Sequence, residues 1–120
     1  MPHGPRFQQL AADAKAHIRE ITAQQAAAEQ QAGALLIDVR ESDEFTKEHA
    51  TGAIPMSRGT LELKIEEKAP DAATPIICYC GGGSRSALSA ESLKRMGYTN
   101  VSSLAGGFKA WKDANLPTAT

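Results

Sequence analysis

The sequence has almost no net charge, and this excludes several classes of protein. Its 13 Lys and Arg residues nearly balance 14 Asp and Glu residues, which gives a formal net charge of -1. A protein whose main partner is nucleic acid or an acidic membrane carries a basic excess, so neither is expected as a partner. Any charge on a substrate must therefore be met by a few local groups.

Long apolar runs are also missing. Hydrophobic residues make up 42% of the 120 residues, which is enough to build the core of one domain. No run approaches the length of a membrane-spanning helix. The first residues, MPHGPRFQQ, contain no apolar segment of the kind found in secretory signals. We therefore expect a single cytoplasmic domain.

Cysteine is scarce, since the chain has only Cys78 and Cys80. On one strand their Cα atoms would lie about 6.6 Å apart with parallel side chains, at the far edge of disulfide geometry. We expect two free thiols in a reducing compartment, with Cys80 exposed at a helix start and Cys78 buried and inert. No spacing of Cys and His resembles a zinc site, so we expect neither a metal nor a cofactor.

The most informative stretch is IICYCGGGSRSALSAE, residues 76–91. An apolar run ends at Cys80, three glycines follow, and Arg85 lies at the start of an Ala-rich helical pattern. A helix N-terminus and a nearby arginine favour the nucleophilic thiolate. Glycines can adopt positive φ angles that turn N–H groups inward, which makes a nest for an anion or an anionic sulfur. The GxxxxGK[ST] spacing of a phosphate-binding loop is absent.

Periodicity predicts helices and strands in alternation, the pattern of an α/β domain with a largely parallel sheet. Ligands of such sheets bind at the carboxyl ends of the strands, where Cys80 stands. Thr22 and Ser42 are the expected helix caps. The expected elements are helices at 7–17, 22–31, 42–49, 60–68, 84–96 and 108–116, and strands at 18–21, 35–39, 53–56, 75–80 and 101–104.

The chain ends are expected to lie outside the α/β core. Residues 1–17 are interpreted as an extension with a short amphipathic helix, residues 18–117 as the domain, and residues 118–120 as a tail. Phe7, Leu10 and Ala14 recur at helical spacing, which predicts one apolar face for the extension. That face would cover the sheet or pack on a second copy of the chain.

Four motifs together resemble the single-domain rhodanese-like sulfurtransferases. They are LLIDVRESDEF at 35–45, HATGA at 49–53, CYCGGGSRS at 78–86 and LAGGFKAWKDANLP at 104–117. The resemblance covers residues 18–117. Two departures are EHATGA at 48–53, where many relatives read GHIPGA, and Asn115 in place of a frequent glycine.

The resemblance implies a three-layer fold with a central, mostly parallel, five-stranded sheet between helices. It implies that Cys80 accepts sulfane sulfur from thiosulfate or a persulfide as a cysteine persulfide. A thiophilic acceptor, cyanide in vitro or a thiol in the cell, would then remove that sulfur. The alternative is a carrier or docking module that serves a sulfur-relay protein and has little turnover on small donors.

The resemblance also assigns the active-site loop. It places amide or anion binding on Gly81, Gly82, Gly83, Ser84, Arg85 and Ser86. Arg85 would bind an anionic donor or anchor the loop to an acid. Ser84 and Ser86 would be hydroxyl donors or helix caps, with Ser86 favoured as the cap. Related phosphatases with the same fold place five residues between Cys and Arg, whereas this chain has four, which disfavours phosphatase chemistry.

Other candidate residues lie outside the loop. Asp38 and Arg40 are expected to form a structural ion pair near the site. Arg58 and Lys64 lie in a segment that walls the pocket in related domains, and each is either a substrate-binding cation or a solvated surface charge. Gly106 and Gly107 are expected to let the backbone approach the loop. His49 is interpreted as a packing or hydrogen-bonding residue, and Phe108 and Trp111 as core residues.

Overall fold

The apolar runs form a five-stranded sheet in the computed structural model, which describes residues 3–120. All neighbouring strands are parallel, in the order β1-β6-β5-β2-β4. The strands are β1 (Arg19–Ile21), β2 (Leu35–Asp38), β4 (Ile54–Pro55), β5 (Ile76–Tyr79) and β6 (Val101–Leu104). The predicted α/β fold with a five-stranded parallel sheet is confirmed, and the 18–21 segment is its edge strand.

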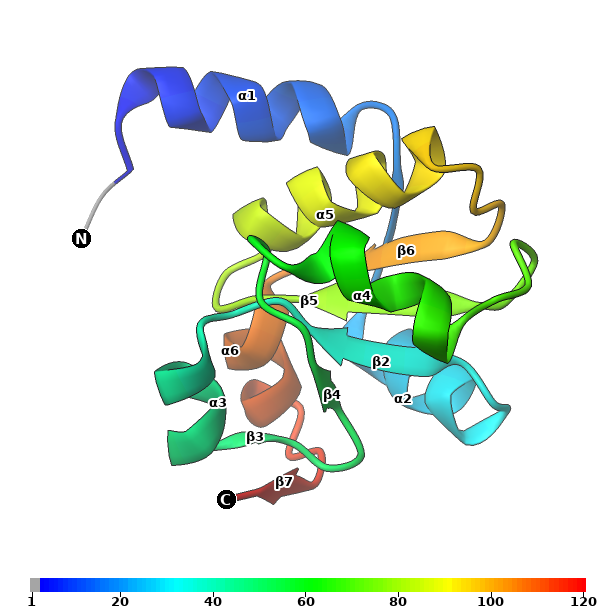
Figure 1. Cartoon of the computed structure of the whole chain (residues 1–120). Helices are drawn as coiled ribbons and strands as arrows, with labels where there is room; N and C mark the ends of the chain where they lie inside the picture. The colour runs from blue at the N-terminus through cyan, green and yellow to red at the C-terminus, as the bar shows by residue number, and fades with distance from the viewer. Residues whose placement is uncertain (1–2) are drawn as a thin grey trace.

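Helices cover both faces of this sheet, so the fold has three layers (Figure 1). Alternate strand residues point to opposite faces. One face packs against α4 (Leu61–Lys68) and α5 (Ser84–Arg95), and its core includes Ile37, Ile76 and Cys78. The other packs against α2 (Ala23–Gln31) and α6 (Gly107–Asp113), and its core includes Leu36, Ile77 and Trp111.

The start of α2 shows how the sequence sets an element boundary. Thr22 caps the helix: its Oγ1 accepts a hydrogen bond from the Gln25 amide at 3.1 Å, and Gln25 Oε1 accepts one from the Thr22 amide at 2.8 Å. This reciprocal pair satisfies two N–H groups that have no partner within the helix. Gly33, with φ of 112°, follows the helix in the left-handed conformation. Both ends are therefore those predicted.

The cap of α3 (Ser42–Lys47) differs from the prediction by one residue. Ser42 is the first helical residue, and Glu41 is the cap. The Glu44 carboxylate reaches back and accepts a hydrogen bond from the Glu41 amide at 3.1 Å. The predicted role of Ser42 as the cap is therefore wrong, because an acid at the third helical position fixes the boundary one residue earlier.

A second, two-stranded sheet joins the end of the chain to its middle. β3 (His49–Ala50) pairs antiparallel with β7 (Thr118–Ala119). The Pro117 carbonyl oxygen accepts hydrogen bonds from Thr51 N–H at 3.0 Å and from Trp111 Nε1 at 2.8 Å. Residues 118 and 119, interpreted from the sequence as a tail, are thus paired with the segment that follows α3.

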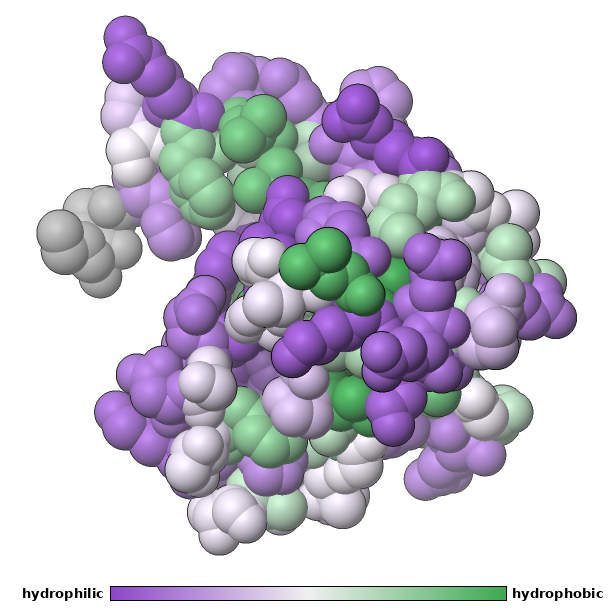
Figure 2. Space-filling view, viewed as in Figure 1, coloured by the Kyte–Doolittle hydropathy of each residue, from purple (hydrophilic) through white to green (hydrophobic). Residues whose placement is uncertain are grey.

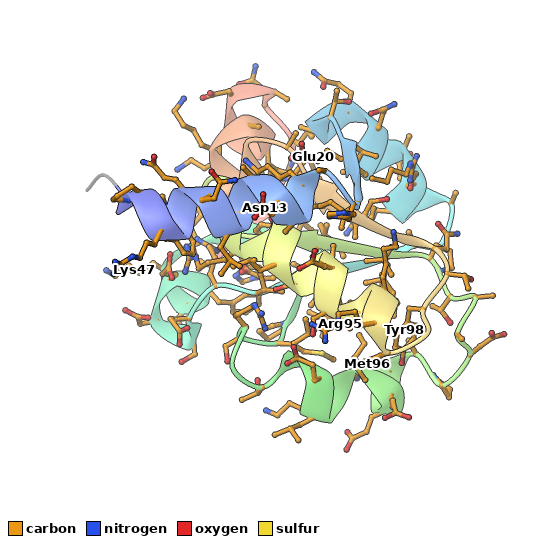
Figure 3. All side chains as sticks on the ribbon, turned by 90° about the horizontal axis from the view of Figure 1, so that it is seen from above. Asp13, Glu20, Lys47, Arg95, Met96 and Tyr98 are labelled. Atoms are coloured by element: carbon orange, nitrogen blue, oxygen red, sulfur yellow. The ribbon has the colours of Figure 1, made fainter. Side chains whose placement is uncertain are left out.

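The N-terminal helix α1 (Pro5–Lys15) lies on α5 and not on the sheet (Figures 1 and 3). Ala11 and Ala14 are buried against it, whereas Leu10, predicted to share the buried face, is 54% exposed. Small side chains make this contact, which lets the two helices approach closely. Apolar side chains remain visible on the surface over α1 (Figure 2). None of the helices in residues 3–120 combines the length and apolar character needed to span a bilayer.

Candidate active site

Cys80 lies directly after β5, at the carboxyl end of the central strand. The sequence predicted an exposed thiol, but the residue is only 1% exposed. The prediction was wrong because the residues after Cys80 fold back over it, so that two amides from the start of α5 lie against the sulfur. The thiol is therefore at the bottom of its loop and not on its rim.

The sulfur of Cys80 is surrounded by hydrogen-bond donors. The Cys80 thiol donates to Ser86 Oγ at 3.5 Å, and the amides of Gly83 and Ser86 donate to Sγ at 3.1 Å and 3.4 Å. These donors are at the N-terminus of α5, the positive end of the helix dipole. The arrangement suits a sulfur that carries negative charge.

One glycine of the three supplies the left-handed turn that the loop needs. Gly83 has φ of 106° and precedes the first residue of α5, whereas Gly81 and Gly82 do not have positive φ. The positive φ that the sequence allows for these glycines is therefore used at one of the three positions. Ser86 is not the cap either, because Gly83 occupies that position and Ser86 Oγ lies 3.5 Å from the sulfur.

The start of α6 packs against the backbone of the loop at Cys80 and Gly81. The Cys80 carbonyl oxygen accepts a hydrogen bond from the Phe108 amide at 2.7 Å. Gly107 has φ of 58°, and a Cβ there would collide with the Cys80 carbonyl oxygen and lie 2.6 Å from the Gly81 carbonyl oxygen. The amide of Gly106 lies beside Gly83 in the same contact. Both glycines of the pair thus lie where the backbone of α6 approaches the loop.

Arg85 is paired with an acid from α3. Its Nη1 lies 2.9 Å from Glu44 Oε1, and its Nη2 lies 3.4 Å from Oε2. Hydrogen bonding to Arg85 lowers the pKa of Glu44. The guanidinium also lies beside Gly81. Of the two roles considered from the sequence, anchoring the loop to an acid is the one that matches this geometry.

Asp38 and Arg40 form the expected ion pair under the site. Arg40 Nη2 lies 2.8 Å from Asp38 Oδ2, and both residues are buried. Tyr79 donates its hydroxyl to the same carboxylate at 2.6 Å and accepts the Ala50 amide at 3.1 Å. Burial and the bond to Asp38 raise the pKa of Tyr79. This network ties the ends of β2 and β5 to β3.

A pocket of about 350 Å³ opens at the carboxyl ends of β2 and β4, the edge of the sheet that also holds Cys80. It is lined by Arg40, Ser42, Pro55, Met56, Ser57, Thr60 and Lys64. Of the two predicted cations, Lys64 lines this pocket. Arg58 instead lies 3.0 Å from Glu62 on α4. A hollow of about 450 Å³ between α1 and α5 contains no residue of the loop.

Ser103 is a residue near the sulfur that the sequence does not predict. It lies on β6, is fully buried, and its Oγ lies 2.8 Å from Ser86 Oγ. The sequence gives no indication of this contact, because Ser103 lies 17 positions after Ser86. Cys78 is buried as expected, and burial, together with the nearby charge of Cys80, raises its pKa to about 12. His49 stacks on Phe45, and Phe108 and Trp111 are in the core.

Comparison with known proteins gives consistent matches. The family model described as Rhodanese-like domain matches residues 22–114. Thiosulfate sulfurtransferase GlpE of Haemophilus influenzae is 41% identical over 102 residues, which cover 85% of this chain and 95% of that protein.

Two solved structures resemble the whole chain. One is a protein of unknown function from Rhodopseudomonas palustris, described as a possible tyrosine phosphatase, with a TM-score of 0.82, 30% identity and coverage of 99% of both chains. The other is the polysulfide-sulfur transferase homodimer of Wolinella succinogenes, with a TM-score of 0.82 and 27% identity, covering 95% of this chain and 87% of that one. The first match includes α1.

Proposed function

The chain belongs to the family of rhodanese-like domains, and from this we propose that it is a sulfurtransferase with Cys80 as the sulfur acceptor. One observation carries the proposal: the Cys80 sulfur lies within hydrogen-bonding distance of the Gly83 and Ser86 amides at the N-terminus of α5. The name of the H. influenzae relative supports thiosulfate as the donor, and that of the W. succinogenes protein supports sulfane sulfur more generally.

The proposed reaction has two displacement steps. The Cys80 thiolate attacks the outer sulfur of thiosulfate, a new S–S bond forms, and sulfite leaves with the electron pair of the old S–S bond. A thiophile then attacks the outer sulfur of the persulfide, and Cys80 leaves as the thiolate. Cyanide gives thiocyanate, and a thiol gives its own persulfide. Each cycle returns the protein to its starting form.

The loop amides are proposed to stabilise negative charge on sulfur in both steps. Gly83 and Ser86 donate from fixed backbone positions, so little reorganisation is needed as charge develops. Since the charge of Arg85 is shared with Glu44, we assign Arg85 mainly to anchoring the loop. Lys64 lines the nearby pocket and would attract an anionic donor, whereas the charge of Arg40 in the same lining is paired with Asp38.

Hydrolysis of phosphate esters is the competing hypothesis, because the R. palustris protein is described as a possible tyrosine phosphatase. Here four residues lie between Cys80 and Arg85, one fewer than in the phosphatases that share the fold. A shorter loop encloses a smaller anion, which favours a single sulfur over a phosphate group.

The deciding experiment is intact mass spectrometry of the reduced protein after incubation with thiosulfate. The wild type should gain one sulfur atom, then lose it to cyanide with formation of thiocyanate. The Cys80→Ser variant should show neither. Absence of the adduct on folded, reduced wild type would refute the proposal. Turnover with an aryl phosphate would favour the competing one, and an adduct without turnover would favour a carrier.

A further inference from the structure

The sulfur of Cys80 is the end of a short chain of hydroxyl groups. Ser86 Oγ lies 3.5 Å from Sγ, and Ser103 Oγ lies 2.8 Å from Ser86 Oγ. All three residues are buried, with exposed fractions of 1%, 0% and 0%. The chain therefore runs from β6 through the first turn of α5 to the sulfur, out of contact with solvent.

The neighbouring residue, Ser102, is equally buried but takes no part in this chain. Consecutive strand residues point to opposite faces, and Ser102 Oγ accepts a hydrogen bond from Arg19 Nη1 at 2.8 Å. Arg19 in turn pairs with Glu29 of α2, on the other side of the sheet. The two serines thus share strand and burial, and only Ser103 faces the sulfur.

The number of protons in the chain depends on the state of Cys80. Within residues 3–120, Ser103 Oγ has one hydrogen-bond partner, Ser86 Oγ, whose other partner is the sulfur. If Cys80 is a thiol, the thiol and the two serine hydroxyls carry three hydrogens. The three groups are joined by only two hydrogen bonds, so one hydrogen is left without an acceptor. If Cys80 is a thiolate, only the two serine hydroxyls carry hydrogens, and each of these hydrogens forms one of the two hydrogen bonds. A buried polar hydrogen without a partner costs free energy. Every hydrogen of the three groups therefore has an acceptor only when Cys80 is the anion.

We propose that Ser103 is a positioning residue that directs the Ser86 hydroxyl hydrogen at the Cys80 sulfur and thereby favours the thiolate. When Ser103 donates to Ser86 Oγ, the acceptor that remains for the Ser86 hydroxyl hydrogen is the Cys80 sulfur. Ser103 does not touch the substrate, so its effect passes entirely through Ser86. The inference rests on the proposed function only in assigning Cys80 as the reactive thiol.

Several charged or titratable groups surround the sulfur and must stay unchanged in any test. Cys78 lies before it on β5, and the charge of Arg58 acts on Cys78. Arg85 on α5 interacts electrostatically with Cys80 and with Glu44 on α3, and Arg40 lies near Arg85. The substitutions below replace neutral hydroxyls only, so each of these charges is retained.

The test is the pH dependence of Cys80 alkylation by iodoacetamide, with the thiolate absorbance as a second signal. Ser103→Ala should move the midpoint of the profile upward by about half to one pH unit, because a hydrogen bond to a charged group is weakened. Ser102→Ala is the matched control and should leave the midpoint in place. Ser103→Thr keeps the hydroxyl and should return the midpoint most of the way to the wild-type value.

A double-mutant cycle separates positioning from general packing. In a Ser86→Ala background, Ser103→Ala should add no further shift, since the hydroxyl that it orients is gone. An unchanged Ser103→Ala profile, an equal shift from Ser102→Ala, or an additive shift in the double variant would each overturn the proposal. If Ser103→Ala does not fold, Ser103→Thr against Ser86→Ala decides: a Thr profile as displaced as that of Ser86→Ala overturns it.

The readout needs no sulfur donor, so it is independent of the proposed activity. A wild type that takes up no sulfur from thiosulfate would refute the sulfurtransferase proposal and leave the alkylation comparison intact. Conversely, normal sulfur uptake with an unshifted Ser103→Ala profile would refute only the role of Ser103.

Discussion

The Arg85 guanidinium lies 2.9 Å from the Glu44 carboxylate, which ties the end of the active-site loop to α3. Both side chains are about one-third exposed, so water and salt screen part of the attraction. The pair has two effects that can be measured separately. It fixes the start of α5, whose amides face the sulfur, and it offsets the positive charge of Arg85 beside the loop.

Glu44→Gln should lower the KM for thiosulfate by about two- to fivefold, because Arg85 then presents an uncompensated charge. The kcat should change less than KM. Asp43→Asn, a neighbouring exposed acid, is the control and should change neither. Because Arg85 lowers the pKa of Glu44, the pair is intact at neutral pH and is lost as the pH falls below the ordinary value of 4.5. A raised KM in Glu44→Gln would contradict this account.

Lys64→Ala should raise the KM for thiosulfate by about two- to fivefold, the effect of one partly solvated charge. Lys64 lines the pocket beside Arg40, whereas Lys68, one turn along α4, does not. Lys68→Ala is therefore the matched control. Steady-state kinetics at low and high salt would show the difference between the two variants shrinking with salt. Equal KM values for the two variants would remove Lys64 from the binding site.

Cys78 should be unreactive in the folded protein at neutral pH. Burial raises its pKa to about 12, so the thiol stays protonated below that value. Iodoacetamide should label one cysteine in the native wild type, none in native Cys80→Ser, and one in Cys80→Ser after unfolding in urea, as counted by intact mass. A label on native Cys80→Ser at neutral pH would show that Cys78 is accessible and ionised.

Gly107→Ala should abolish sulfur uptake. An added Cβ would collide with the Cys80 carbonyl oxygen, so the loop behind the sulfur has to move. Gly97→Ala is the control, because Gly97 also has positive φ, 105°, but a Cβ there meets open space. The left-handed backbone should cost each variant about 1–2 kcal/mol of stability, and the collision adds to this cost in Gly107→Ala. If Gly107→Ala takes up sulfur as Gly97→Ala does, the contact between α6 and the loop is dispensable.

Asp38→Asn should destabilise the fold by about 3–5 kcal/mol, because it leaves Arg40 buried without a counter-charge. Glu29→Gln removes the acid of an exposed pair with Arg19 and should cost about 1 kcal/mol or less. Urea unfolding with a common slope would give both values. Similar losses for the two variants would mean that the Asp38 network does not hold β2 and β5 together.

The sequence predicts this fold well where the signal is periodic or chemical. The buried run at Leu36 and Ile37 marks a strand, and Thr22 with Gln25 marks a helix start. The loop was identified because a cysteine, three glycines and an arginine stand at fixed spacing before a helix. Each of these patterns lies within a short stretch of sequence, and the structure that it predicts depends on the conformation of that same stretch.

The rest depends on contacts between distant parts of the chain. Strand β7 has two residues, too few for any periodicity, and it exists because β3 pairs with it. The burial of Cys80 follows from the way its loop closes, and the link from Ser103 to Ser86 follows from β6 lying next to β5. None of these leaves a pattern that can be read before the strand order is known.

The burial of Cys80 has a consequence for what an acceptor meets. Cys80 is only 1% exposed, and the packed core lies behind it. In the proposed persulfide, the transferable sulfur is a further S–S bond of about 2 Å from Cys80 and has room only on the side away from the core. A loaded protein would therefore present its reactive atom closer to the surface than an empty one. An acceptor that reaches only as far as the outer sulfur would then contact the loaded form and not the empty one.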